Sequence, residues 1–339
     1  MDLAEVWERA RQELKGICSL CRVCDGVVCA GQVPGMGGIG SGAGFQNNVT
    51  ALARVQLNMR TLHAAARPNL KTSLFGVELS LPVLGAPMAG AGVNFRNRTT
   101  EEDMSRWNII GAYQAGTLGS CGQGPDPRIL NAGLAAMAET GGAGIPVIKP
   151  TPWEEMAPLI EQVEKAGCTA LGMDIDAAGL INMRRAGYEV GPKTADEIAR
   201  IVSSTKLPFI LKGIMTVDEA KRAADAGVAG IVVSNHGGRC LDGTPGTADV
   251  LPAIAQAVKG RAKVLMDGGI RSGVDVLKAL ALGADAVLVG RPIIAAGFGG
   301  GVEGVRLLFD HYRDQLETAM ILTGCQSIGE IGPHIIYQA

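Results

Sequence analysis

Short apolar runs recur along the chain after residue 80, and each run ends in a polar residue or in glycine. Near-continuous apolar runs of this length are typical of strands in a sheet that is covered on both faces. Helical patterns lie between several of them, at residues 153–166, 216–226, 247–258 and 274–282. Eight such alternations predict a closed (β/α)8 TIM barrel rather than an open sheet. The eight apolar runs span residues 82–87, 109–114, 145–149, 170–174, 209–213, 230–235, 263–267 and 286–290.

The N-terminal part of the chain follows a different pattern. Residues 1–17 alternate charged and apolar positions at helical spacing, which predicts an amphipathic helix that ends near Gly16. Residues 18–48 are rich in glycine and cysteine and show little periodicity. We therefore predict an extension over residues 1–74, made of a helix, a cysteine-containing segment and a second helix. The barrel then spans residues 75–339.

Composition narrows the class of protein. Apolar residues make up 47% of the chain, so it can bury a large core and is not disordered. Lys and Arg number 31 against 33 Asp and Glu, and no basic block stands out, which disfavours nucleic-acid binding. Uninterrupted apolar runs fall far short of the ~20 residues that a membrane span needs. The charged start is unlike a signal peptide, so we expect no membrane association and a cytoplasmic location.

Half of the cysteines lie close together in the N-terminal segment. They form the pattern Cys18-x2-Cys21-x2-Cys24-x4-Cys29. In a reducing compartment such a group indicates metal ligation before disulfide formation. The spacing is close to that of a ferredoxin, with the last gap one residue longer, which favours an iron–sulfur cluster. Tetrahedral zinc and free or redox-active thiols stay open as alternatives.

The predicted strands end in residues that carry chemistry. In a barrel of this kind the loops after the strands gather at one face, where active sites lie. Charged and imidazole groups at so many strand ends are not a packing requirement, so we predict an active site on this rim. The residues that follow the runs in chain order are Met88 and Ala89, Ser120, Lys149, Asp174 and Asp176, Lys212, 234–239, 267–271, and Gly290 with Arg291.

The last two of these loops predict a phosphate site. Glycine at Gly268, Gly269 and Gly290 lets backbone N–H groups approach an anion, and helices are predicted to begin just beyond. Arg271 and Arg291 add guanidinium groups that suit a phosphate. The phosphate belongs to either a substrate or a cofactor.

Four other strand-end residues suit acid–base chemistry on an anionic substrate. The imidazole of His236 suits a general base, while the guanidinium of Arg239 suits a carboxylate. Asp174 is placed to orient the imidazole and to stabilise its cation. Lys212 is placed to stabilise an anion that forms during the reaction. No serine lies in a nucleophile-elbow motif, so hydrolysis is disfavoured.

Residues 207–216, 233–243 and 266–273, and above all the run Ser-Asn-His-Gly-Gly-Arg at 234–239, carry a family resemblance. The chain resembles the FMN-dependent α-hydroxy acid dehydrogenases and oxidases, the lactate and glycolate oxidase family. The resemblance implies an oxidoreductase that converts a small L-2-hydroxy acid, such as lactate, to the 2-oxo acid and passes electrons to an acceptor. It also implies a homo-oligomer, a tetramer in many members.

The resemblance also implies roles for individual residues. His236 is the base, Asp174 its partner, and Arg239 the group that binds the substrate carboxylate. Lys212 lies at the N1/O2 edge of the flavin. The other residues implied in FMN binding are Pro87, Met88, Ala89, Ser120, Lys149, Ser234, Asp267 and Gly268, with Gly269, Arg271, Gly290 and Arg291 at the phosphate.

The chain departs from the family pattern at the substrate side. Members carry active-site tyrosines near the N-terminus and at strand 3, but here no tyrosine precedes residue 113 and strand 3 ends in Lys149. Tyr188 is a candidate to replace a missing phenol. A second carboxylate-binding arginine after strand 4 matches Arg184 or Arg185. Two other functions therefore stay open: an FMN-dependent isomerase like the type 2 isopentenyl diphosphate isomerases, and a non-catalytic flavin or metal sensor.

Overall fold

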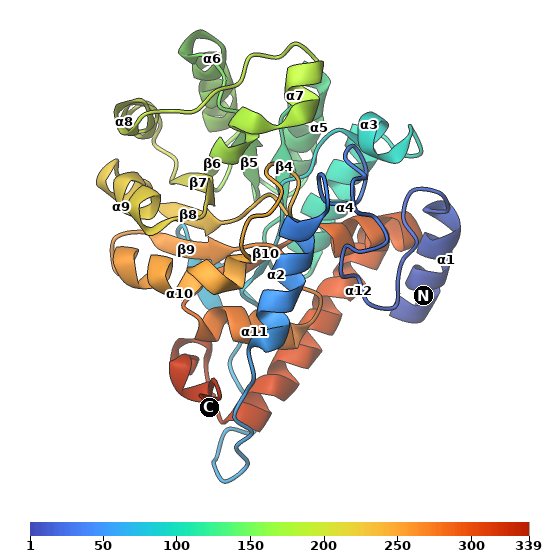
Figure 1. Ribbon diagram of the computed structural model, residues 1–339, viewed down its shortest axis with the longest axis vertical. Helices are drawn as coiled ribbons and strands as arrows, with labels where there is room; N and C mark the ends of the chain where they lie inside the picture. The colour runs from blue at the N-terminus through green and yellow to red at the C-terminus, as the bar shows by residue number, and fades with distance from the viewer. Residues whose placement is uncertain (339) are drawn as a thin grey trace.

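Eight parallel strands form a nearly closed barrel in the computed structural model, which describes residues 1–338. The strands pair in the order β3-β10-β9-β8-β7-β6-β5-β4, and helices surround them (Figure 1). The Gly122 N–H donates to the Met88 carbonyl at 3.0 Å, which links the two terminal strands. The TIM-barrel prediction is confirmed. The strands are β3 (Val83–Gly85), β4 (Ser120–Gly122), β5 (Ile145–Ile148), β6 (Leu171–Asp174), β7 (Phe209–Ile214), β8 (Gly230–Val233), β9 (Lys263–Met266) and β10 (Ala286–Val289).

Helices follow the strands around the outside of the barrel. The four helices that the sequence predicts correspond to α6, α9, α10 and α11. Threonine or serine caps several of them, as Thr216 does for α9 and Ser272 for α11. The helices are α3 (Ala91–Phe95), α4 (Glu101–Gln114), α5 (Pro127–Ala138), α6 (Trp153–Lys165), α7 (Ile181–Arg185), α8 (Ala195–Ser203), α9 (Val217–Asp225), α10 (Thr247–Val258), α11 (Gly273–Ala281) and α12 (Arg291–Thr323).

One of the predicted strands is wrong. Residues 109–114 form the last part of helix α4, and the second barrel strand is β4, a few residues later. A short apolar run cannot by itself distinguish a buried strand from a buried helix segment. Here Thr100 caps the helix through its side chain, and the helix then continues through the apolar run. The sequence Ser-Cys-Gly of β4 lacks the branched and aromatic residues that mark most strands.

Asn108 on α4 holds the ends of the first two barrel strands together. Its buried Nδ2 donates to the Ala86 carbonyl at 2.9 Å and to the Ser120 carbonyl at 2.6 Å. We expect Asn108→Ala to lower the free energy of unfolding by about 1–3 kcal/mol, because two buried carbonyls lose their donor. Urea denaturation measures this. Arg106→Ala on the exposed side of the same helix is the control, and an equal loss in both variants contradicts the prediction.

Two apolar cores stabilise the barrel. One lies inside it, where Ile210, Val232, Leu265 and Leu288 meet Leu79. Leu79 belongs to a hairpin of β1 (Thr72–Leu74) and β2 (Val77–Leu79), which packs against this interior. The larger core lies between the strands and the helices. The barrel is therefore filled with side chains, and the cavity described below opens at the strand ends.

The N-terminal residues pack onto the barrel at two places. Helix α1 (Leu3–Glu13) lies beside α12 (Figure 1), and Val6 contacts Gly299, where a Cβ atom would lie 2.0 Å from the Val6 carbonyl oxygen. Helix α2 (Ala43–Arg54) packs against α10 and α11. Its buried Asn48 exchanges hydrogen bonds with Asn235, in the loop after β8. The extension thereby contributes to the same face of the barrel as the predicted active site.

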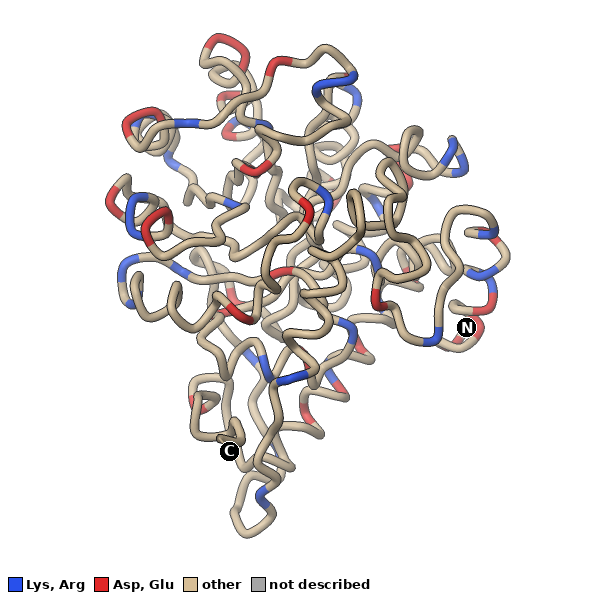
Figure 2. Tube along the Cα trace, viewed as in Figure 1, with Lys and Arg blue, Asp and Glu red and all other residues tan. Residues whose placement is uncertain are grey.

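The distribution of charge and the hydropathy of the helices relate to the prediction that the protein has no nucleic-acid or membrane partner. Lys and Arg are interspersed with Asp and Glu around the outer helices (Figure 2), with no single-sign block. Helix α12 is long and apolar enough, by length and composition alone, to cross a membrane. It changes direction at Gly301, and 56% of its most apolar stretch is buried inside the fold. A core helix of a soluble protein has the same properties.

Candidate active site

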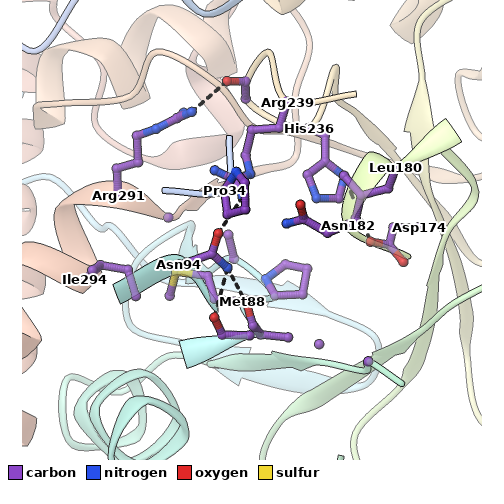
Figure 3. A pocket seen from close by; sticks show the side chains of 18 of the residues that line it. Pro34, Met88, Asn94, Asp174, Leu180, Asn182, His236, Arg239, Arg291 and Ile294 are labelled. Atoms are coloured by element: carbon purple, nitrogen blue, oxygen red, sulfur yellow. Dashed lines mark hydrogen bonds and ion pairs between the residues drawn. The ribbon is translucent and has the colours of Figure 1, made fainter. Parts of the chain in front are cut away.

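A cavity of about 470 Å³ opens at the carboxyl ends of the strands, a volume typical of sites for small ligands. Figure 3 shows it from close by. Its lining includes most of the predicted site residues: Pro87, Met88, Ala89, Lys149, Asp174, Arg185, Lys212, His236, Arg239, Asp267, Gly268, Gly269, Arg271, Gly290 and Arg291. Ser120, Ser234, Arg184, Tyr188 and the four N-terminal cysteines do not line it. Of the two candidate arginines after β6, only Arg185 lines the cavity.

His236 lies in the loop after β8 in a left-handed conformation, with φ of 58°. Residues other than glycine adopt this conformation uncommonly, although asparagine, aspartate and histidine do so more often than the rest, and such positions are concentrated at functional sites. The backbone N–H of His236 donates to Ser234 Oγ at 3.0 Å. At Gly238, with φ of 76°, a Cβ atom would lie 2.2 Å from the Phe45 nitrogen of α2. The extension thus packs directly against the loop that presents the imidazole.

The carboxylate that lies nearer to His236 is that of Asp176 rather than that of Asp174. The Nδ1 atom of His236 lies 3.1 Å from Asp176 Oδ1 and 3.9 Å from Asp174 Oδ2. Asp176 lies on a 3-10 turn after β6, and Gly213 in a bulge of β7 leaves room for it. Burial opposes ionisation of Asp176, but the charges of Lys212 and His236 outweigh it and lower its pKa to about 2.

Asp174 instead forms an ion pair with Lys149. Lys149 Nζ lies 2.6 Å from Asp174 Oδ2, and both side chains are buried. Lys149 lies at the end of β5, where the family resemblance leads us to expect a tyrosine. Asp174 therefore lies farther from the imidazole than Asp176 does, and its nearest charged partner is Lys149. The partnership of Asp174 with His236 stays a prediction.

Lys212 of β7 lies among carboxylates. Its Nζ is 3.5 Å from Asp267 Oδ2, and Asp174 is its register partner on β6. Burial alone would lower the pKa of Lys212, but the charges of Asp176, Asp267 and Asp174 raise it above the ordinary value. The ammonium group therefore stays charged at the cavity wall, as the predicted role of stabilising an anion requires.

Arg239 has hydrogen-bond partners but no ion-pair partner within residues 1–338. Its guanidinium donates to the Gly35 carbonyl and, at 3.0 Å, to Asn94 Oδ1. Asn94 lies on α3 and donates in turn to the carbonyls of Ala89 and Gly90. Figure 3 shows Arg239 beside His236. Nothing in the local sequence around Asn94 marks it as a functional residue, so sequence analysis missed it.

The predicted phosphate site carries uncompensated positive charge. Arg291 donates to the carbonyls of Met36 and Gly237 at 2.7 and 2.9 Å. Burial, together with Arg239 and Arg271, lowers the pKa of Arg291 to about 9. Arg271 has a buried Nε atom without a partner. None of the three forms an ion pair within the described chain, and α12 begins directly after Gly290, so the site fits the phosphate of FMN.

Tyr188 does not line the cavity, but it contacts Gln123, which does. The Gln123 Nε2 atom donates to the Tyr188 hydroxyl at 2.8 Å, and Gln123 Oε1 accepts from the Lys149 backbone at 2.7 Å. Tyr188 therefore does not replace a missing phenol in the cavity. Gln123, which sequence analysis did not consider, is the group that lies against the ligand space.

The four N-terminal cysteines lie in a segment without helix or strand, between α1 and α2. Burial is the main cause that raises the pKa of Cys18, with Cys24 and Cys21 adding to it and a Leu20 backbone N–H opposing it. Within residues 1–338, the only three candidate ligand atoms that lie within 4.8 Å of one another belong to Asp176, His236 and Cys240. The sulfur atoms are therefore not arranged as a ready tetrahedral zinc site.

Comparisons with known proteins agree with this geometry. A family model described as FMN-dependent dehydrogenase matches residues 35–195 and 189–338. The 2-hydroxyacid oxidase 2 of Mus musculus is 31% identical over 330 residues, which cover 87% of this chain and 90% of that protein. The L-lactate oxidase of Lacticaseibacillus rhamnosus is 32% identical over 326 residues, covering 87% and 86%.

Solved structures give the same result. A crystal structure of mandelate oxidase matches with a TM-score of 0.79 and 32% identity, covering 97% of this chain and 96% of that chain. The structural match covers 97% of this chain, and the family model covers residues 35–338. The chain therefore belongs to the FMN-dependent 2-hydroxy acid dehydrogenase and oxidase family, enzymes that oxidise a CH–OH group.

Proposed function

We propose that this enzyme oxidises a small L-2-hydroxy acid of the lactate type to the 2-oxo acid. One observation carries the proposal: Arg239 is a cation without a counter-charge in the described chain, beside His236, in one cavity. A carboxylate on the substrate supplies the missing charge, and a guanidinium binds it through two parallel hydrogen bonds. The substrate carbon that bears the hydroxyl group then lies next to the imidazole.

His236 acts as the base in this proposal. Its Nδ1 atom faces Asp176 at 3.1 Å, so the tautomer with the proton on Nδ1 leaves Nε2 free to accept a proton from the substrate. Asp176 is ionised at neutral pH, because its pKa is lowered to about 2. Its charge stabilises the imidazolium ion that forms when Nε2 takes the proton.

The lysines of the cavity wall have separate tasks. Bound FMN supplies the two-electron oxidation, which no side chain of the protein provides. Lys212 stabilises negative charge on the cofactor side of the cavity, since its ammonium group stays protonated. Lys149 neutralises Asp174, so that Asp174 does not repel the substrate carboxylate.

The two other functions have less support. The curated relatives reported above are oxidases, which favours net oxidation over an isomerase reaction. A diphosphate-bearing alkene also has no carboxylate for Arg239 to bind. A non-catalytic sensor does not need a base held by a carboxylate, as His236 is here.

Anaerobic titration of the FMN-loaded enzyme with L-lactate, glycolate and L-mandelate tests the proposal. We expect the flavin absorbance to bleach with at least one of them, and the 2-oxo acid to form in equal amount. Arg239→Met should raise the concentration for half-bleaching about 100-fold, since loss of one partner of a buried charge pair costs about 2–5 kcal/mol. Flavin that no hydroxy acid bleaches, in a folded and loaded enzyme, would refute the proposal.

The matched control replaces an arginine that does not line the cavity. Arg184 directly precedes Arg185 on α7 but lies outside the lining, so Arg184→Met should leave the half-bleaching concentration within about twofold of the parent. An equal effect of both substitutions would show that charge at the rim, rather than a specific contact with Arg239, determines affinity.

A further inference from the structure

We propose that Cys18, Cys21, Cys24 and Cys29 bind a [4Fe–4S] cluster that takes electrons from the flavin site. The part of the proposal that concerns binding stands on the cysteine segment alone. The electron route rests on the proposed function. Neither the fold nor the active-site residues discussed above require these cysteines, none of which lines the cavity.

The spacing favours a cluster over a single ion. Three cysteines follow one another at three-residue steps and the fourth comes five residues later, so one short loop carries all four. In the ferredoxin run C-x2-C-x2-C-x3-C the first three cysteines bind one cluster, and Cys18, Cys21 and Cys24 have this spacing, with Cys29 as the fourth ligand in our proposal. Structural zinc sites more often take two pairs of ligands from segments that lie well apart in the sequence. Within the described residues no three of these thiols lie within 4.8 Å of one another, so they are not already arranged around a single ion.

The backbone of the segment is free to surround a cluster. No backbone N–H between Ser19 and Gly26 donates to another backbone carbonyl. The Leu20 N–H lies against the Cys18 sulfur, and Leu20 adopts a left-handed conformation with φ of 42°. Backbone N–H groups that face sulfur are what tune iron–sulfur clusters in proteins. A loop of this shape without a bound group has few interactions of its own to hold it.

Charge in the surrounding residues suits an anionic group at this place. A [4Fe–4S] core with four thiolates is a dianion in its oxidised state. Arg271 donates through Nη2 to Cys24 Sγ at 3.4 Å, and its buried Nε has no partner. Arg291 stacks on the Phe45 ring, 3.8 Å from the ring centroid, with Arg271 on the same ring at 5.5 Å. Arg271 lies between the phosphate site and the cysteine segment, so its positive charge acts on both.

The segment also lies close to the active-site cavity. Cys18 packs against an apolar group of side chains that includes Met36 and Ile294, and both of these line the cavity. Arg271 contacts Cys24 on one side and lines the cavity on the other. Side chains that line the cavity therefore also pack against Cys18 and Cys24, which gives electrons a short path from the flavin site to the cluster.

Oxidation of one 2-hydroxy acid releases two electrons and two protons. The cluster accepts one electron at a time, changing between its 2+ and 1+ core states. Each electron passes on to an external one-electron carrier, so one substrate reduces two carriers while the two protons go to water.

Anaerobically purified enzyme should contain about four iron and four acid-labile sulfide atoms per chain. Dithionite should produce the electron paramagnetic resonance signal of a reduced cluster. Cys21→Ala/Cys24→Ala should lose the iron, the sulfide and the signal, while Ser19→Ala in the same segment should keep all three. Stoichiometric zinc without sulfide, thiols joined in a disulfide without metal, or iron that persists in the double variant would each overturn the cluster.

Reduction by substrate tests the electron route separately from the proposed function. We expect an active 2-hydroxy acid to produce the same resonance signal as dithionite in the wild-type enzyme. If the flavin bleaches but only dithionite reduces the cluster, the route is wrong and the proposed function stands. If a cluster is present but no hydroxy acid bleaches the flavin, the proposed function is wrong and the cluster stands.

Discussion

Replacement of His236 by asparagine should leave FMN bound and should slow reduction of the flavin by about 10,000-fold. The amide cannot take a proton from the substrate at neutral pH, so the base is lost. Asparagine suits the position because His236 has φ of 58°, and asparagine tolerates this left-handed conformation better than alanine does. Anaerobic stopped-flow absorbance of the flavin band measures the rate, and the spectrum before mixing measures cofactor content.

His311→Asn provides the matched control. His311 lies on α12 away from the active-site cavity, where it contacts Gln315, so its replacement should leave the rate of flavin reduction within about twofold of the parent. Flavin reduction at the parent rate in His236→Asn would remove His236 as the base. Loss of FMN together with activity would show instead that the loop after β8 serves to bind the cofactor.

Replacement of Asp176 by asparagine should slow flavin reduction by about 100-fold. The contact of Asp176 with His236 Nδ1 holds the imidazole in one tautomer and stabilises the imidazolium ion. A neutral amide stabilises the imidazolium ion poorly. Because the pKa of Asp176 is lowered to about 2, the parent carboxylate stays ionised well below neutral pH. Protonation of Asp176 therefore should not limit the parent rate between pH 5 and 8.

Asp174→Asn is the comparison that distinguishes the role of Asp174 from that of Asp176. It removes the partner of the buried Lys149 ammonium, so its main effect should be a loss of about 3–5 kcal/mol in the free energy of unfolding. Urea denaturation measures stability and stopped-flow absorbance the rate in both variants. If Asp174→Asn slows the folded enzyme more than Asp176→Asn does, Asp174 is the group that orients the imidazole.

Sequence patterns predicted most of the barrel and failed at one strand. Seven of the eight predicted strands coincide with strands of the structure, because their apolar runs are short and bounded by turn residues. The exception, residues 109–114, is an apolar face of α4 whose N-terminal cap lies nine residues upstream of the run. Strand β4, which is the true second strand of the barrel, has no hydrophobic pattern. A three-residue strand of small side chains forms because the neighbouring strands pair with it.

Sequence patterns likewise predicted part of the active site and missed part of it. Residue type and position at a strand end were enough to predict His236, Arg239, Lys212 and the phosphate loops, because the barrel brings all strand ends to one face. Position at a strand end does not tell which carboxylate contacts the imidazole. Asp174 and Asp176 are two residues apart, and a lysine on the adjacent strand decides between them.

The sequence alone therefore determined the barrel, the rim that carries the chemistry and, through residues 234–239, the family. These follow from periodicity and short motifs, which depend on residues close together in the chain. Only the tertiary structure decided that Asp176 holds His236, that Arg185 rather than Arg184 reaches the cavity, and that Cys24 lies against Arg271. Such contacts join residues far apart in the chain, and the packing of loops sets their distances, which no local pattern encodes.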